Sequence, residues 1–125
     1  MTSPTPPQPS VSVPPPDDKD WTWVLERPCD DCGFEPTGIA GEALPGLIRE
    51  ATAAWATVLT RPEDSLRERP TPTTWSPLEY ACHVRDVNAL FAERAGLILG
   101  GGGEQVQFAN WDQDASAIER RYSEA

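Results

Sequence analysis

The residues with the clearest chemical potential in this chain surround its only histidine, His83. Glu79 lies four residues before His83, and Asp86 lies three residues after it. On an α-helix these spacings bring the three side chains to neighbouring positions on one side. Imidazole and carboxylate groups ligate divalent metals, and a carboxylate can also orient a ligating imidazole. The pattern therefore predicts a metal-ligand role for His83, with Glu79 and Asp86 as candidate catalytic residues.

Each of these residues also has a structural interpretation. A single histidine beside an apolar stripe is often partly buried and hydrogen-bonded to a neighbour. Glu79 follows Ser76 by three residues and would complete a capping box, whereas its chemical alternative is a general base for a bound thiol. Asp86 either orients the ring of His83 or pairs at the surface with an arginine.

Cys29 and Cys32 form a second constellation, in the order Cys-Asp-Asp-Cys-Gly. Two cysteines at this spacing, followed by glycine, resemble one half of a zinc knuckle. The third thiol, Cys82, is adjacent to His83 on the expected helix, so only one of these two could supply a further ligand. Reduced structural thiols, a separate metal half-site and a redox pair all stay open. The two intervening aspartates are expected to raise the thiol pKa and to disfavour a reactive thiolate.

Composition excludes several classes of partner. The chain has 125 residues with 20 acidic and 10 basic side chains, for a net charge of −10. A nucleic-acid-binding surface needs clustered positive charge, so we expect no nucleic acid partner. No apolar run reaches the roughly 18 residues of a membrane-spanning helix, and the N-terminus lacks a secretory signal pattern. We therefore expect a cytoplasmic protein with no membrane partner and with reduced cysteines.

Three regions differ in character along the chain. Residues 1–18 are a proline-rich tail that we expect to be disordered. Residues 19–40 form an irregular segment with tryptophans and cysteines, in which 21–25 alternate in a way that suggests a short extended stretch. Residues 41–125 carry helical periodicity and are expected to form the folded part.

The folded part begins with two long helices. Apolar residues recur at three- and four-residue spacing over 42–60, which predicts the first helix. A charged connection with several prolines follows over 61–75. The second helix is predicted over 77–99, with Ser76 as its cap and the glycine run 100–103 as its end.

A third helix is predicted near the end of the chain. Asp112 or Asp114 would cap it, and its apolar face would extend to Tyr122. Two long amphipathic helices and an incomplete third indicate an all-α bundle. Because such a bundle is open on one side, we expect a homodimer or another partner to cover the exposed helical seam.

The segment around His83 resembles the second helix of the DinB/YfiT-like superfamily. The residues that carry the resemblance, in the pattern Trp-Ser-x-x-Glu-x-x-x-His-x-x-Asp, are Trp75, Ser76, Glu79, His83 and Asp86. The resemblance covers roughly residues 40–125 and implies a partial DinB-like four-helix bundle, truncated before the fourth helix. Related proteins include the N-terminal domains of mycothiol-dependent maleylpyruvate isomerases.

The resemblance also implies a function. Family members bind a divalent metal, such as Zn²⁺ or Ni²⁺, through three histidines, and His83 matches one of them. The other two form a His-x-x-x-His pair on the fourth helix, which has no counterpart in this chain. The implied ancestral activity is that of a metal-dependent transferase or isomerase that uses a low-molecular-weight thiol. Family naming alone adds a methyltransferase-type label, and the alternative is a non-catalytic helical dimerisation or interaction module.

Overall fold

The computed structural model describes Asp20 and residues 22–125, so the proline-rich tail and Trp21 lie outside the described residues. Within these described ranges the regular structure is entirely helical, which confirms the all-α expectation. The α-helices are α1 (Leu44–Val58), α2 (Glu63–Arg67), α3 (Pro77–Gly100) and α4 (Gln113–Glu119). Short 3₁₀ turns are η1 (Thr22–Leu25), η2 (Pro36–Gly38), η3 (Gly41–Ala43) and η4 (Tyr122–Glu124). None of the described helices combines the length and apolarity that crossing a bilayer demands.

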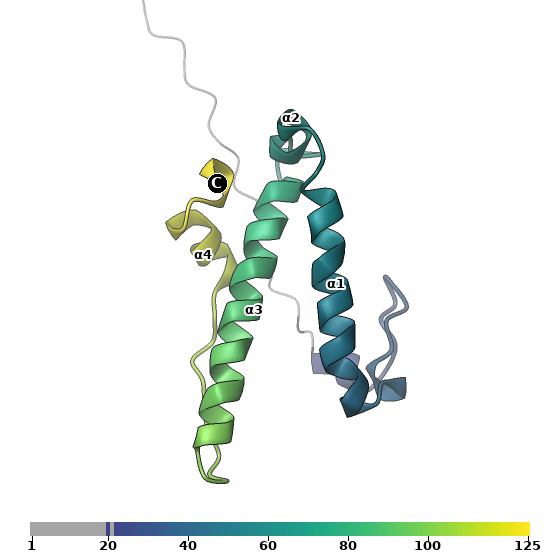
Figure 1. The fold of residues 1–125 in the computed structure, drawn as a ribbon, viewed down its shortest axis with the longest axis vertical. Helices are drawn as coiled ribbons and strands as arrows, with labels where there is room; N and C mark the ends of the chain where they lie inside the picture. Colours follow the sequence, from purple (N-terminus) through teal and green to yellow (C-terminus); the bar gives the residue numbers. More distant parts are fainter. Residues whose placement is uncertain (1–19, 21) are drawn as a thin grey trace, which may run out of the picture.

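Helix α1 forms where the sequence predicts the first helix, and Pro45 occupies its opening turn. A proline is well placed there because the amide it lacks would have no partner within the helix. The apolar stripe of α1 remains uncovered, however, since Leu47 is 44% exposed and Ile48 is 53% exposed. In Figure 1, α1 and α3 lie close together near α2 and spread apart toward their other ends.

Helix α3 has the start and the end that the sequence predicts. The Ser76 hydroxyl accepts a hydrogen bond from the Glu79 amide at 3.2 Å, and the Glu79 carboxylate accepts one from the Ser76 amide at 3.1 Å. This reciprocal pair is the expected capping box. After the helix, Gly102 and Gly103 have φ values of 64° and 89°, which favour glycine and turn the chain back.

The expectation of a short extended stretch in the N-terminal segment needs correction. Residues 22–25 are not extended, because Thr22–Leu25 form the 3₁₀ turn η1. The Asp20 carboxylate accepts hydrogen bonds from the amide and the hydroxyl of Thr22, and such local bonds favour a turn. The charged connection 61–75 contains a short helix that was not predicted from the sequence, α2, whose Leu66 is buried.

The third predicted helix is shorter than its pattern suggests. Asp112 caps α4, as expected, by accepting hydrogen bonds from the amides of Asp114 and Ala115. The helix then ends at Glu119, and Arg121 adopts a left-handed conformation with φ 52°. Tyr122 therefore lies in η4 rather than on the face of α4. The reversal returns η4 to α3, which it contacts directly.

Apart from Cys29, the buried residues of the described chain gather around the N-terminal half of α3. Figure 1 places α2 and the segment that contains α4 at this half, and both contact α3. The apolar or aromatic members are Leu66, Trp75, Cys82 and Tyr122, and the polar members are Ser76, Glu79 and Asp86. Glu79 and Asp86 thus belong to the small core itself.

Candidate functional site

His83 lies between two tryptophans that flank α3. Its ring stacks on Trp111, with 5.6 Å between centroids and 10° between planes. Trp75 approaches it at 5.5 Å with a tilt of 48°. Trp75 directly precedes the cap of α3, and Trp111 directly precedes the cap of α4, so the two helix starts position the rings. This aromatic clamp holds the imidazole in one orientation.

The imidazole of His83 has an unusual polar environment. Its Nδ1 is buried and has no hydrogen-bond partner among the described residues. Burial lowers the pKa of His83 below 6.5, although the negative charges of Asp86 and Asp114 oppose this shift. A lowered pKa keeps the ring neutral at pH 7, and neutral imidazole is the form that accepts a hydrogen bond or ligates a metal.

Glu79 is fully engaged in structural contacts. Both of its oxygens accept hydrogen bonds from Arg69, at 2.8 Å each, in addition to the bond from the Ser76 amide. Burial, the largest single influence, raises the pKa of Glu79, but the hydrogen bonds and charge of Arg69 and the hydrogen bonds from Ser76 together outweigh it and leave the pKa below its usual value. A carboxylate held by a guanidinium is a weak base, so this geometry supports the capping interpretation of Glu79.

Asp86 connects α3 to the end of the described chain. Its carboxylate accepts a hydrogen bond from the Tyr122 hydroxyl and pairs with Arg120 at 2.7 Å and with Arg85 at 2.9 Å. Burial tends to raise the pKa of Asp86, but these donors lower it overall. Burial and the Asp86 carboxylate in turn raise the pKa of Tyr122. The influence of Asp86 on His83 is electrostatic, since its hydrogen bonds go to other residues.

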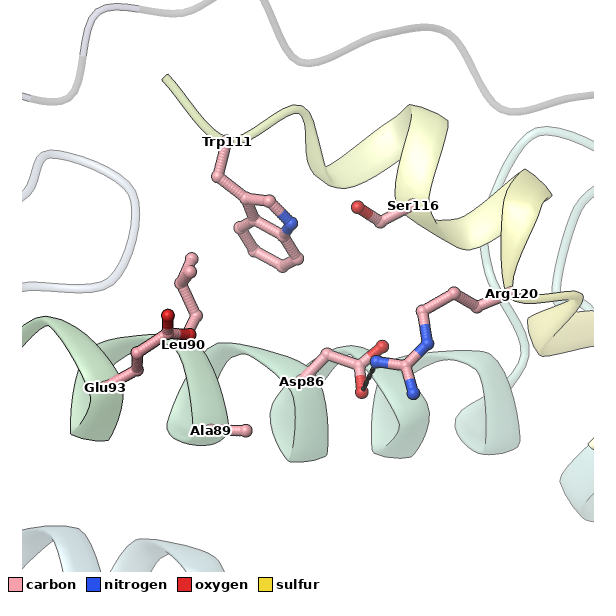
Figure 2. A pocket seen from close by; sticks show the side chains of 7 residues that line it. All are labelled: Asp86, Ala89, Leu90, Glu93, Trp111, Ser116 and Arg120. Carbon is pink, nitrogen blue, oxygen red and sulfur yellow. Dashed lines mark ion pairs between the residues drawn. The ribbon is translucent and has the colours of Figure 1, made fainter. Parts of the chain in front are cut away.

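A pocket of about 220 Å³ lies beside this cluster. Figure 2 shows Trp111 over α3, facing Leu90, and Arg120 reaching from the end of α4 to Asp86. The residues that line the pocket are Asp86, Ala89, Leu90, Glu93, Trp111, Ser116 and Arg120. Trp111 connects the pocket to His83, because its side chain lines the pocket and its ring stacks on the imidazole of His83.

The predicted metal ligands do not converge within the described chain. No three histidine, cysteine, aspartate or glutamate side chains among these residues are arranged to hold a metal ion. His83 offers one nitrogen, while the carboxylates of Glu79 and Asp86 are bound by arginines. The described donor set therefore does not fit a complete three-ligand site, which divalent metals of this type require.

The two cysteines of the N-terminal segment lie in a separate loop that backbone hydrogen bonds close. The Cys29 amide donates to the Phe34 carbonyl at 2.8 Å, and the Gly33 amide donates to the Cys29 carbonyl at 2.8 Å. The expectation of a raised thiol pKa is wrong for Cys29. The backbone amides of Cys32 and Asp31 donate to its sulfur and lower its pKa, which outweighs the negative charge of Asp31. Cys29 is buried, whereas Cys32 is exposed.

Sequence reasoning missed three residues that organise the site. Arg69, Arg120 and Tyr122 carry no motif, and their partners lie far away in sequence. The sequence did contain one signal for these partners, which is the pair of carboxylates on the apolar side of α3. A buried carboxylate requires a cationic or hydroxyl partner.

No protein-family model, curated protein or solved structure matches this chain. The fold and the site together define an all-helical protein with a histidine clamped between tryptophans. A separate loop presents two thiols.

Proposed function

We propose that residues 41–125 are the N-terminal part of a DinB-like metal-binding bundle and that His83 is the ligand they contribute to a divalent metal. The single observation that carries this proposal is the buried, unpartnered Nδ1 of a neutral imidazole. Leaving such an atom without a hydrogen bond costs about 1–3 kcal/mol of stability. A protein that retains this cost is expected to use the nitrogen for binding a ligand. The aromatic clamp supports the same role because it fixes the ring orientation.

The proposed site is incomplete in the described residues. Two further ligands would come from a fourth helix, which additional protein sequence or a partner chain would supply. A complete site would place this protein among thiol-dependent transferases or isomerases, and the pocket beside Trp111 would offer space for a small thiol. In this chain Glu79 and Asp86 serve as structural supports of that site.

Metal titration tests the role of His83. In a Cys29→Ala/Cys32→Ala background, which removes competing thiols, we expect Ni²⁺ and Zn²⁺ to bind weakly and His83→Ala to weaken binding at least about tenfold. Isothermal titration calorimetry gives both affinities, and His83→Gln serves as a control of similar size. Equal affinity in the histidine and alanine forms, or no detectable binding in either, would contradict the proposal.

A second candidate function is a non-catalytic helical association module. The observation that favours this module is the set of exposed apolar side chains on the two long helices, α1 and α3. Those on α1 and just after it are Leu44, Leu47, Ile48 and Leu59, and those on α3 are Phe91, Leu97, Ile98 and Leu99. Exposed apolar side chains of this kind are found at association sites and on aggregation-prone faces.

The oligomeric state tests this second candidate. We expect the wild type to sediment as a dimer at micromolar concentration and Leu47→Glu/Ile48→Glu to sediment as a monomer with unchanged helicity. The matched control is Arg49→Glu, which introduces negative charge at a neighbouring exposed position on α1. Analytical ultracentrifugation distinguishes the outcomes, and a monomeric wild type would exclude self-association through this face.

A further inference from the structure

The Cys29–Cys32 loop is a structural feature that the proposed function does not use. It lies in the N-terminal segment, outside the buried cluster around α3. Two backbone hydrogen bonds close the loop, and Gly33 adopts φ 75°, a conformation that favours glycine. The chain therefore maintains a defined turn around two thiols in a segment with little other regular structure.

We propose that this loop binds a thiophilic metal ion through the sulfur atoms of both Cys29 and Cys32. The ligand chemistry is thiolate coordination, which soft and borderline ions such as Cu(I) and Zn²⁺ favour. Each cysteine would release its thiol proton to solvent as its sulfur bonds to the metal, with no change in oxidation state.

The first support for this proposal is the hydrogen bonding of Cys29. The amides of Cys32 and Asp31 both donate to its sulfur, and the Cys32 side chain also hydrogen-bonds to it. Amide donors stabilise negative charge on sulfur, whether the sulfur is a free thiolate or a metal-bound one. The hydrogen-bond donors around Cys29 therefore suit a metal-bound sulfur, and the contact between the two side chains brings Cys32 close to it.

The second support is the charge around the loop. Asp30 pairs with Arg27 at 3.2 Å, and both side chains are exposed. The Asp30 carboxylate thus binds the guanidinium of Arg27. The sulfur atoms of the two cysteines are then the groups that coordinate the metal ion. With two aspartates and a thiolate against one arginine, the loop carries net negative charge, which attracts cations and repels anionic thiols such as glutathione.

The burial of Cys29 distinguishes metal binding from redox exchange. A catalytic dithiol needs its stabilised thiolate exposed to the incoming disulfide. Here the stabilised sulfur belongs to Cys29, which is only 7% exposed, whereas Cys32 is open to solvent. The burial of Cys29 therefore favours a small ion, which can also bind the exposed Cys32, over a bulky peptide disulfide.

The number of ligands sets the stoichiometry. Within the described part of the chain, no third ligating side chain joins the two cysteines. Two thiolates suffice for Cu(I), so it would bind once per chain. Zn²⁺ prefers four ligands, so two copies of this loop would share one ion. In both cases, one Cu(I) per chain or one Zn²⁺ per two chains, the metal is bound by the same two sulfur atoms of each chain.

Competition titrations under anaerobic, reducing conditions test this proposal. Cu(I) is titrated against the chelator bathocuproine disulfonate, and Zn²⁺ against a chromogenic chelator with sedimentation analysis. We expect Cys29→Ser and Cys32→Ser each to weaken metal binding at least about tenfold. Cys82→Ser is the matched control, because Cys82 is a buried thiol on α3 whose pKa is raised by burial.

The outcomes separate this site from the one proposed at His83. One Cu(I) per chain, or one Zn²⁺ per two chains together with metal-dependent dimerisation, supports the loop site. The His83→Ala variant should bind as the wild type does, even if the function proposed for His83 fails. Undetectable binding of both metals, or binding that both serine variants retain, would overturn the proposal. Far-UV circular dichroism of each variant checks that the helices are intact.

Discussion

Replacing Glu79 by alanine is expected to destabilise the protein by about 3 kcal/mol, one of the largest effects of any single substitution in the chain. The Glu79 side chain is 5% exposed, and that of its partner Arg69 is 19% exposed. Both carboxylate oxygens bind the guanidinium, and one of them also accepts the Ser76 amide. Truncation therefore removes the Glu79 carboxylate from a largely buried cation and removes half of the capping box at the start of α3.

Chemical denaturation followed by far-UV circular dichroism measures this loss. The matched control is Glu63→Ala, which breaks the exposed Glu63–Arg67 pair of 3.0 Å on α2. That pair joins residues four positions apart at the surface, so its loss should cost no more than about 0.5 kcal/mol. Glu79→Gln keeps an acceptor for the Ser76 amide and should be intermediate. Similar losses for the Glu79→Ala and Glu63→Ala variants would refute a special role for Glu79.

The same carboxylate gives the stability a defined pH dependence. Although burial is the largest single influence and opposes it, the hydrogen bonds and charge of Arg69 together with the hydrogen bonds from Ser76 hold the folded-state pKa of Glu79 below its ordinary value of 4.5. Below pH 4.5 the unfolded chain therefore binds a proton more readily than the folded one. The contribution of Glu79 is complete above pH 4.5 and is lost as the pH falls through the folded-state pKa.

Features set by neighbouring residues could be predicted from the sequence. The start of α3 depends on Ser76, Pro77 and Glu79, which interact within four residues and leave a recognisable pattern. Its end depends on glycines that adopt positive φ. The cap of α4 at Asp112 is equally local. Such interactions form in any context that permits the helix, which explains why both ends of α3 and the start of α4 agree with the sequence.

Features that depend on distant parts of the chain could not be predicted in this way. Glu79 meets Arg69 across 10 positions, and Asp86 meets Tyr122 across 36. The apolar pattern of α1 indicates a helix but does not say whether another element covers it. The thiol pKa of Cys29 depends on where two backbone amides point, and the sequence showed only the charges beside it.

The second large effect is expected at Asp86, which anchors the last described turns to α3. Its side chain is 6% exposed and binds Arg120 at the end of α4 and Tyr122 in η4. Asp86→Ala leaves the Tyr122 hydroxyl buried without its acceptor and leaves the arginines without their anion. We expect a loss of about 3 kcal/mol, concentrated in the attachment of α4 and η4 to α3.

Hydrogen exchange localises this effect, because amides of residues 113–124 should lose protection before those of α2. Arg85→Ala is the matched control. Arg85 is 57% exposed on α3, so its pair with Asp86 should contribute less than about 1 kcal/mol. Tyr122→Phe removes only the hydroxyl and should cost about 1.5–3 kcal/mol, since the lost hydrogen bond ends on a charged group. Equal loss of protection in α2 and in residues 113–124 would contradict local anchoring.

The Asp86→Ala substitution is also expected to change the environment of His83. Trp111 directly precedes the cap of α4 and forms one wall of the aromatic clamp. When α4 detaches, the His83 ring gains access to water, and the desolvation that lowers its pKa is relieved. The pKa of His83 in Asp86→Ala should therefore move up toward 6.5, even though the removed negative charge acts in the opposite direction. Desolvation is the larger influence in the folded protein, so its release prevails. Titration of the His83 ring by NMR, compared between Asp86→Ala and Arg85→Ala, tests whether the Asp86 anchor also maintains the clamp.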